Sequence, residues 1–209
     1  MEEMPRPAGA HLAASEVRAI LSPAVVVVHG TEEDALGAGG VLVTGLELAS
    51  AKVRPGDMFA ALPGHVTHGA AYCQDALDRG AAAILTDAPG VQMMDPGLRR
   101  TVTVIEVESP RSHLGALASA VYGHPSRQLT LMGITGTNGK TTVAAMVEAG
   151  LRAAGRITGI IGTVGIRFAG TSLPAARTTP EAPHLHAMLG TMLQAGVDSV
   201  AIEVSSHAL

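Results

Sequence analysis

The stretch "GITGTNGKTT", Gly133 to Thr142, has the form of an apolar strand that runs into a glycine-rich turn and then into a helix. Backbone N–H groups freed by Gly136 and Gly139 can point at phosphate oxygens, and a helix beginning near Lys140 adds the positive end of its dipole. In such a loop the lysine reaches the β/γ-phosphates and the hydroxyl of Thr141 sits on Mg²⁺. The pattern therefore predicts a site for a nucleoside triphosphate.

Three further loop residues, Thr137, Asn138 and Thr142, belong to the predicted phosphate site. The longer pattern G-x-x-x-x-G-K-[ST] is not met, because its first glycine would fall on Ile134. The alternative interpretation is a plain glycine turn with an exposed lysine and an asparagine that tolerates a left-handed conformation. The order of strand, loop and helix favours the mononucleotide site.

Strands and helices alternate through the second half of the chain. Apolar strands are predicted at 129–136, 157–166 and 198–206, and helices at 112–123, 137–155 and 180–196. Alternation at these lengths predicts parallel strands joined by crossover helices. We therefore expect an α/β fold in which residues 111–209 form the first part of a parallel-sheet P-loop domain, with about three of its parallel strands.

The first half of the chain has the pattern of a smaller α/β domain that runs from residue 1 to a boundary near Pro110. One helix is expected at 14–21 and another at 69–80, where Arg79-Gly80 is a normal C-terminal stop. Apolar and β-branched runs bounded by glycine and proline predict strands. These runs lie at 24–30, 41–48, 54–64, 81–87 and 101–107.

Composition restricts the classes of function. Hydrophobic residues make up 47% of the 209 residues, enough for a packed core. A net charge of −4 without basic runs argues against a nucleic-acid-binding surface. The single cysteine, Cys73, leaves no internal disulfide and no cysteine-based metal site. No apolar run reaches the ~18 residues of a membrane span and no signal-peptide core is present, so we expect a cytoplasmic protein.

Several segments taken together resemble the Mur ligases, the ATP-dependent amide ligases of peptidoglycan precursor synthesis. The phosphate loop is similar in this family and in its folylpolyglutamate synthetase relatives. Three further segments resemble the tripeptide-forming branch of the family, and the alanine-rich, aromatic-poor composition resembles its actinobacterial members. These segments are "KVRPGDMFAALPGHVTHG" (52–69), "ARTTPEAP" (176–183) and "EVSSHAL" (203–209).

The resemblance implies a three-domain enzyme, with a small N-terminal domain for the uridine nucleotide, a central ATP domain and a C-terminal domain for the incoming amino acid. ATP would phosphorylate the γ-carboxylate of D-Glu in UDP-MurNAc-L-Ala-D-Glu. The amine of a diamino acid, meso-diaminopimelate or L-lysine, would then attack the acyl phosphate and form the amide. Such a transfer mainly needs positioning and charge neutralisation. The resemblance thus implies ATP and Mg²⁺ as cofactors.

The resemblance also implies roles for residues of the central domain. Lys140 and Glu203 would be catalytic, with Thr141 and Glu203 as ligands of Mg²⁺. The pair Thr178-Thr179, together with Ser205, would contact the UDP-linked substrate. Other interpretations stand beside these, because Thr179 before Pro180 is a good helix N-cap and a carboxylate at a strand end can simply be solvated.

In the first domain the resemblance places the uridine side of the substrate at four residues: Ser50, His65, Val66 and Thr67. The family has a turn of the form L-D-S-R where this chain has "LASAK" (48–52), so only the serine of D-S-R is kept. His65 could also be an ordinary solvated histidine, and His68 is expected to be structural. Because no pair of histidines shares a helix face with a third ligand nearby, oxygen-bound Mg²⁺ is the expected metal chemistry.

The likeness runs to the last residue, before the family's carbamylated lysine, its later histidine and arginine, and its amino-acid-binding domain. We therefore expect an N-terminal part of such an enzyme that does not ligate alone, with an apolar sheet edge that favours self-association. Three other interpretations are a folylpolyglutamate-type ligase, a P-loop kinase or switch protein, and a nucleotide-binding module without turnover. A folylpolyglutamate-type ligase would not explain a uridine-type domain. A P-loop kinase would require arginines on a lid, which are not evident in the sequence.

Overall fold

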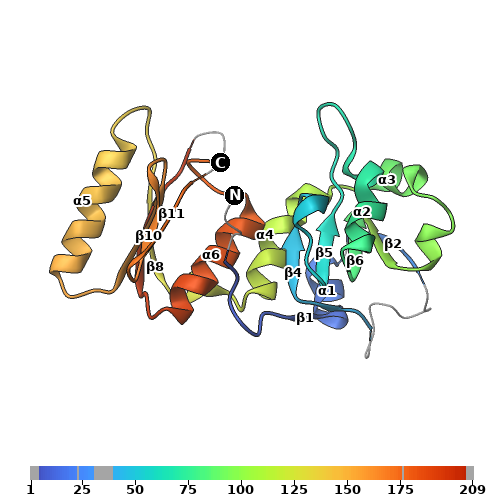
Figure 1. Cartoon of the computed structure of the whole chain (residues 1–209), viewed down its shortest axis with the longest axis horizontal. Helices are drawn as coiled ribbons and strands as arrows, with labels where there is room; N and C mark the ends of the chain where they lie inside the picture. Colours follow the sequence, from blue (N-terminus) through green and yellow to red (C-terminus); the bar gives the residue numbers. More distant parts are fainter. Residues whose placement is uncertain (1–4, 23, 31–39, 176, 206–209) are drawn as a thin grey trace. The chain divides into compact units, whose positions relative to one another are not determined.

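The computed structural model describes residues 5–22, 24–30, 40–175 and 177–205 (Figure 1). The chain forms two compact units, a first unit of residues 9–123 and a second unit of residues 124–209 together with residues 1–8. The boundary expected near Pro110 differs from this division, because helix α4 (Pro110–Val121) packs on α1 and β4 and so belongs to the first unit. The described part of the chain holds no helix long and apolar enough to cross a bilayer.

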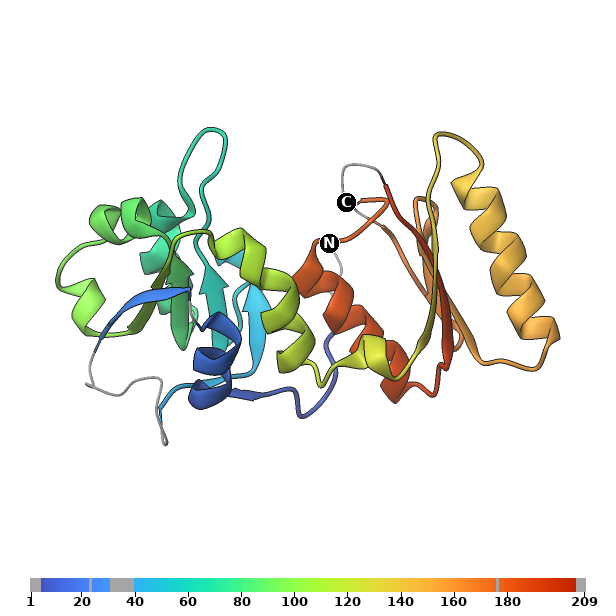
Figure 2. The ribbon, with the colours of Figure 1, turned by 180° about the vertical axis from the view of Figure 1, so that it is seen from behind.

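The first unit is built on a five-stranded sheet in the order β2-β7-β6-β5-β4. Strands β4 to β7 pair in parallel, and β2 pairs antiparallel with β7 at one edge. Helices α2 and α3 lie on one face of this sheet, and α1 and α4 lie on the other (Figures 1 and 2). The strands are β2 (Val25–His29), β4 (Gly45–Glu47), β5 (Asp57–Ala60), β6 (Ala83–Thr86) and β7 (Thr103–Val107), and the other helices are α1 (Ala14–Leu21), α2 (Cys73–Asp78) and α3 (Ala88–Met93).

Alternation along the strands of the first unit explains its core. Successive side chains point to opposite faces, so Phe59, Ile84 and Val104 all pack against α2 and α3. Cys73 lies in the same cluster, and burial raises the pKa of its thiol to about 12. Short elements complete the unit: β1 (Leu12–Ala13) pairs with β3 (Leu42–Val43), and 3-10 turns lie at η1 (Ser50–Lys52), η2 (Gly69–Tyr72) and η3 (Leu98–Arg100).

The second unit also contains a five-stranded sheet, in the order β11-β10-β9-β12-β8. The three strands β9, β12 and β8 are parallel, as expected from the alternating pattern. The strands are β8 (Thr130–Ile134), β9 (Thr158–Gly162), β10 (Gly165–Phe168), β11 (Thr171–Leu173) and β12 (Ser199–Glu203), with helices α5 (Lys140–Ala153) and α6 (Ala182–Gln194) and a short turn η4 (Pro125–Arg127).

Helices α5 and α6 cover opposite faces of the second sheet (Figures 1 and 2). Ile160 and Ala201 pack under α5 with Ala144, whereas Ile161 and Val200 belong to the cluster on the α6 side. Because successive side chains of a strand point to opposite faces of the sheet, these residues show which face every other strand residue occupies. By this alternation Gly162 and Glu203 face the side of α5 and of the phosphate loop.

The predicted single strand at 157–166 is wrong, because this segment turns back on itself. Residues Thr163 and Val164 form a two-residue turn between β9 and β10, and β10 and β11 continue as antiparallel strands. Gly165 has a φ of 127°, which favours glycine at the end of this turn. The sheet is therefore mixed, with parallel strands next to the phosphate loop and a hairpin extension at the other edge.

The packing of α6 on the segment near η4 generates a pH prediction. His186 of α6 has a buried Nδ1 without a hydrogen-bond partner among the described residues. Burial, with a contribution from the nearby His124, lowers the pKa of His186. The unfolded chain therefore takes up a proton near pH ~6.5 that the folded chain resists, so stability is complete above that pH and falls as the pH drops below it.

We expect His186→Gln to flatten the fall in unfolding free energy between about pH 6.5 and pH 5, because its side chain does not titrate. Urea unfolding at several pH values measures this slope. His65→Gln, which changes an exposed loop histidine, is the control and should keep the wild-type slope. An unchanged slope in His186→Gln would contradict the assignment.

Candidate functional site

The second unit brings its polar side chains together around Glu203, the last residue of β12. In the parallel pairing of β12 with β8, Glu203 stands opposite Ile134, so its carboxylate lies beside the loop that leaves β8. Glu203 is only 1% exposed. Ligand sites of parallel sheets form at the carboxyl ends of the strands, and this residue occupies such an end.

Hydroxyl and amide groups hold this carboxylate. Thr141 Oγ1, in the first turn of α5, donates to Glu203 Oε2 at 3.0 Å. The backbone N–H of Thr163 donates to Oε1 at 3.0 Å, and the hydroxyl of Thr163 donates to Oε2 at 3.1 Å. Both oxygens of Glu203 are therefore occupied by donors from two segments, the start of α5 and the turn after β9.

The glycine loop has the backbone that a phosphate cradle needs. Gly136 and Gly139 have φ angles of 148° and 79°, in the region that favours glycine. Residues 137–139 are exposed, and α5 begins at Lys140 directly after them. The ammonium of Lys140 lies inside the loop, where Nζ donates to the carbonyl of Gly136 at 2.7 Å. Thr142 follows in the first turn of the helix.

The oxygens at this point suit a hard cation. Thr141 Oγ1 and Glu203 Oε2 are neighbours, and Mg²⁺ binds through one or two protein oxygens while substrate phosphates and waters supply its remaining ligands. Within the described ranges no group of three or more His, Cys, Asp or Glu side chains could hold a metal. The site therefore fits a metal that arrives with a phosphate ligand, and it does not fit an all-protein cage.

The threonine pair at 178–179 joins the same network. Thr179 Oγ1 donates to the backbone carbonyl of Glu203 at 2.9 Å and accepts from the N–H of Ser205 at 2.9 Å. Thr178 Oγ1 lies 3.2 Å from Thr163 Oγ1. The interpretation of Thr179 as a helix N-cap is wrong, because α6 begins at Ala182 with Glu181 in the cap position. Its hydroxyl instead ties the end of β12 to the segment before α6.

Two residues of this network, Gly162 and Thr163, are missing from the sequence-based prediction. Gly162 leaves room for Glu203, since a Cβ at this position would overlap Oε1 of that residue. Thr163 is the turn residue that donates twice to the carboxylate. The sequence does show a glycine followed by a threonine at the end of a predicted strand. It does not show that both residues contact Glu203, which lies about 40 residues further along the chain.

In the first unit, Ser50 lies in η1 at the carboxyl end of β4. A hydrogen bond from Ser50, with further contributions from Arg79, lowers the pKa of Asp75 on α2 below its ordinary value. The serine hydroxyl therefore already has a partner in this structure. It lies at the same end of the parallel sheet as the loop that follows β5, which holds His65, Val66 and Thr67.

That loop is exposed at its tip and anchored at its base. Val66 is 97% exposed, and His65 and Thr67 are exposed beside it. At the base, His68 Nδ1 accepts from the N–H of Ala70 at 3.0 Å, so the ring proton is on Nε2, which donates to Asp87 Oδ1 at 2.9 Å. His68 is structural, as expected, and it fixes where the exposed tip begins.

Family comparison adds to this geometry. Residues 42–122 match the model described as Mur ligase family, catalytic domain, and residues 134–209 match the Mur ligase middle domain. The chain belongs to the Mur ligase family. The two matches fall within the two structural units, so the family assignment covers both the exposed loop with Ser50 and the network around Glu203.

Two curated relatives are both named UDP-N-acetylmuramoyl-L-alanyl-D-glutamate–2,6-diaminopimelate ligase. The relative from Streptomyces avermitilis is 49% identical over 167 residues, which is 80% of this chain and 32% of the relative. That from Corynebacterium glutamicum is 44% identical over 184 residues, 88% of this chain and 34% of the relative. The chain thus spans about a third of the length of these relatives.

Solved structures of Mur ligases share the fold. A structure of UDP-N-acetylmuramoyl-L-alanyl-D-glutamate–2,6-diaminopimelate ligase superposes with a TM-score of 0.61 at 23% identity, covering 79% of this chain and 32% of that one. MurF ligase from Thermotoga maritima in complex with ADP gives a TM-score of 0.54 at 22% identity, covering 84% of this chain and 34% of that one. At these identities the likeness establishes the α/β fold of the family.

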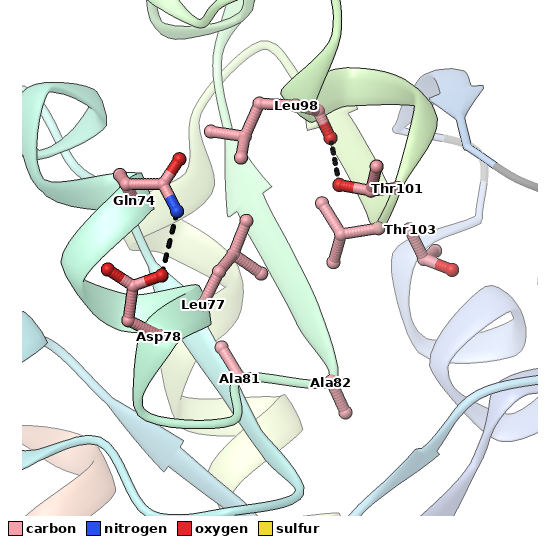
Figure 3. Close-up of a pocket in the computed structure, with 9 residues that line it drawn as sticks. Gln74, Leu77, Asp78, Ala81, Ala82, Leu98, Thr101 and Thr103 are labelled. Atoms are coloured by element: carbon pink, nitrogen blue, oxygen red, sulfur yellow. Dashed lines mark hydrogen bonds between the residues drawn. The ribbon is translucent and has the colours of Figure 1, made fainter.

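Two surface hollows lie apart from these residues. One of about 380 Å³ lies near α2 and η3, where Gln74 pairs with Asp78 and the hydroxyl of Thr101 donates to the carbonyl of Leu98 (Figure 3). Another of about 460 Å³ lies between α5 and the start of β9, at the end of the sheet away from the phosphate loop. Neither hollow includes a residue predicted for phosphate, metal or substrate.

The anchor beneath the exposed loop gives a stability prediction. Asp87 accepts from both His68 and the N–H of Gly90, so Asp87→Ala removes the N-cap of α3 and leaves a mostly buried imidazole donor unpaired. We expect a loss of about 2–3 kcal/mol in urea unfolding. The control is Asp95→Ala, which removes a similar cap from Gly97 and Leu98 at an exposed site and should cost about 1 kcal/mol or less. Equal losses would show that the His68 contact adds nothing.

Proposed function

We propose that this chain forms the ATP-binding and UDP-substrate-binding part of an ADP-forming ligase that adds a diamino acid to UDP-MurNAc-L-Ala-D-Glu. The names of relatives at 44–49% identity support the reaction class. One structural observation supports it most. The carboxylate of Glu203 accepts hydrogen bonds both from Thr141 of the phosphate loop and from Thr163. Thr163 in turn contacts Thr178 of the proposed substrate pair.

The residues have distinct roles in this proposal. The glycine loop, from Gly136 to Thr142, surrounds the phosphates with backbone N–H groups, and Lys140 leaves the carbonyl of Gly136 to neutralise the transferring phosphoryl group. Thr141 and Glu203 hold Mg²⁺, which supplies charge neutralisation at the phosphates when it is bound. ATP and Mg²⁺ are thus the proposed cofactors.

Substrate-binding residues are proposed for each unit separately. Thr178, Thr179 and Ser205 would contact the muramoyl-dipeptide near Glu203, where the γ-carboxylate of D-Glu must meet the phosphoryl group. Phosphorylation makes this carboxylate an electrophile for the amine of the diamino acid. In the first unit, the uridine side of the substrate would be bound by four residues at one end of the sheet: Ser50, His65, Val66 and Thr67. A reaction that uses ATP and a UDP-linked precursor also fits the proposed cytoplasmic location.

The experiment that tests this function is calorimetric titration of the 209-residue chain with UDP-MurNAc-L-Ala-D-Glu, with UDP-MurNAc-L-Ala as the comparison ligand. We expect saturable binding that prefers the dipeptide form, because the threonine pair lies beside the site of carboxylate phosphorylation. If the chain binds ATP in a separate titration but binds neither uridine ligand, the result would favour the second candidate, a nucleotide-binding module without turnover. It would also be the result expected of a folylpolyglutamate-type ligase.

We also propose that the β8 side of the second unit favours self-association. Among the described residues β8 pairs on one side only, with β12, and Leu131 and Met132 of β8 are 37% and 38% exposed. Helix α5 contacts β8, and its apolar residues Val143 and Met146 are 46% and 68% exposed. Contiguous exposed apolar surface next to an unpaired strand edge promotes association.

Light scattering after size-exclusion chromatography over a range of concentrations measures this association. We expect Met146→Glu to shift the chain toward monomer, because it places a charge in the exposed apolar face. Val164→Glu is a matched control, since Val164 is 73% exposed in the β9–β10 turn. A wild-type chain that stays monomeric at high concentration would overturn the proposal.

A further inference from the structure

Glu203 is a buried acid with unusual neighbours. Within the described residues its carboxylate is held by hydrogen bonds from threonines, and no lysine, arginine or histidine is among its partners. Burying a carboxylate without a basic partner costs free energy unless hydrogen bonds replace those it made to water. The hydrogen bonds from the threonines therefore determine whether the carboxylate can be buried and how it is oriented. The geometry of the donors therefore fixes the orientation of the group.

The two oxygens of Glu203 have different surroundings. Oε1 accepts from the backbone N–H of Thr163 at 3.0 Å, a donor that the hairpin turn leaves free of the sheet. Oε2 accepts from the hydroxyls of Thr141 and Thr163, at 3.0 and 3.1 Å. The main chain thus holds one oxygen, while the other faces Thr141 in the first turn of α5 and accepts hydrogen bonds only from hydroxyls, which can rotate.

Gly162 makes this arrangement possible. A Cβ at this position would overlap Oε1 and would lie 2.7 Å from the carboxyl carbon of Glu203. Both atoms belong to the end of the Glu203 side chain, so an added methyl group would push the carboxylate away from the donors that hold its two oxygens. The absence of a side chain on β9 therefore lets the carboxylate lie flat against the strand, within reach of the next backbone N–H.

The hydroxyl of Thr163 also sets a direction for the hydrogen bonds. A hydroxyl has one hydrogen, and the charged Oε2 is a stronger acceptor than a neighbouring hydroxyl. When Thr163 donates to Glu203, the contact of 3.2 Å with Thr178 is made by the hydrogen of Thr178. The order Thr178 to Thr163 to Glu203 then links the proposed substrate pair to the carboxylate.

We propose that Thr163, with the space left by Gly162, is a positioning residue that presents Oε2 of Glu203 to the cation of a Mg²⁺-nucleotide and connects it to Thr178. This inference rests on the proposed function of the site. It assigns no chemistry to Thr163 itself, which acts through Glu203. Removing its hydroxyl should therefore weaken the Mg²⁺-dependent part of nucleotide binding and leave the part made by the glycine loop.

The first test compares ATP affinity with Mg²⁺ and with EDTA, by calorimetry on the 209-residue chain. We expect Thr163→Val to reduce the enhancement of affinity by Mg²⁺ about tenfold, as for a lost hydrogen bond to a charged group, with little change in EDTA. Thr163→Ser should restore most of it. Thr158→Val is a matched control that removes a 2.6 Å hydroxyl–carboxylate bond to Glu148 at the other end of β9, and it should keep the wild-type enhancement.

The role of Gly162 has its own variant pair. Gly162→Ala should abolish most of the Mg²⁺ enhancement, since the new methyl group displaces the carboxylate. Gly133→Ala adds a methyl group to β8 in the same sheet, where the nearest side-chain atom is 3.5 Å away, and it should behave like wild type. A full Mg²⁺ enhancement in both Thr163→Val and Gly162→Ala would overturn the positioning role.

A double-mutant cycle in urea unfolding separates this inference from the proposed function. Thr163→Val and Glu203→Gln should have non-additive effects on the unfolding free energy, because the two side chains are in contact. If the wild-type chain shows no Mg²⁺-dependent ATP binding, the proposed function fails, and the cycle still decides whether Thr163 holds Glu203. Additive effects would overturn the positioning of Glu203 by Thr163, whatever the chain binds.

Discussion

The carboxylate of Glu203 is the point on which the second unit depends, because a charged group that is 1% exposed must be met by donors from its surroundings. The donors to the carboxylate come from two places in the chain, the start of α5 and the turn after β9, and the segment before α6 holds the backbone carbonyl of the same residue. These segments are brought together by the parallel order of β9, β12 and β8, whose carboxyl ends lie at one edge. The sheet thus aligns a phosphate loop, an acid and a threonine pair without a long loop between them.

The same logic of parallel strands organises the first unit. Ser50 and the exposed loop with His65 follow the carboxyl ends of β4 and β5, and the base of that loop is held by His68 and Asp87 at the end of β6. Rigid anchors below exposed tips are the usual way in which a scaffold presents binding residues. Each unit therefore offers one surface built at the carboxyl edge of its own sheet, which agrees with membership of a family whose models match both units.

Much of this was predictable from local pattern. The helix at 14–21, the strand–loop–helix around Lys140 and the parallel strands at β8, β9 and β12 follow from periodicity and from glycine placement. The hairpin of β10 was not predictable in this way, because "ITGIIGTVGI" reads as one apolar run and lacks an Asn-Gly or Asp-Gly turn. Helix α3 was missed because Pro89-Gly90 has the composition of a turn, whereas Asp87 caps a short helix there.

The residues of the site also fall into those that the sequence could suggest and those that only long-range contacts reveal. Lys140 and Thr141 stand in a local sequence pattern, and the family resemblance implies the role of Glu203. The partners of Thr163, in contrast, lie 15 and 40 residues away and have no local signal. The alternative interpretation of Thr179 as a helix cap fails for the converse reason. A local rule fitted its sequence, but its hydroxyl is used by the main chain of Glu203 and Ser205.

The most direct measurement is a crystal structure of this chain with Mg²⁺ and a non-hydrolysable ATP analogue. We predict a cation bound by the Thr141 hydroxyl and by Oε2 of Glu203, with Oε1 still accepting from the backbone N–H of Thr163. A cation bound elsewhere in the loop, or a Glu203 carboxylate turned away from Thr163, would contradict it.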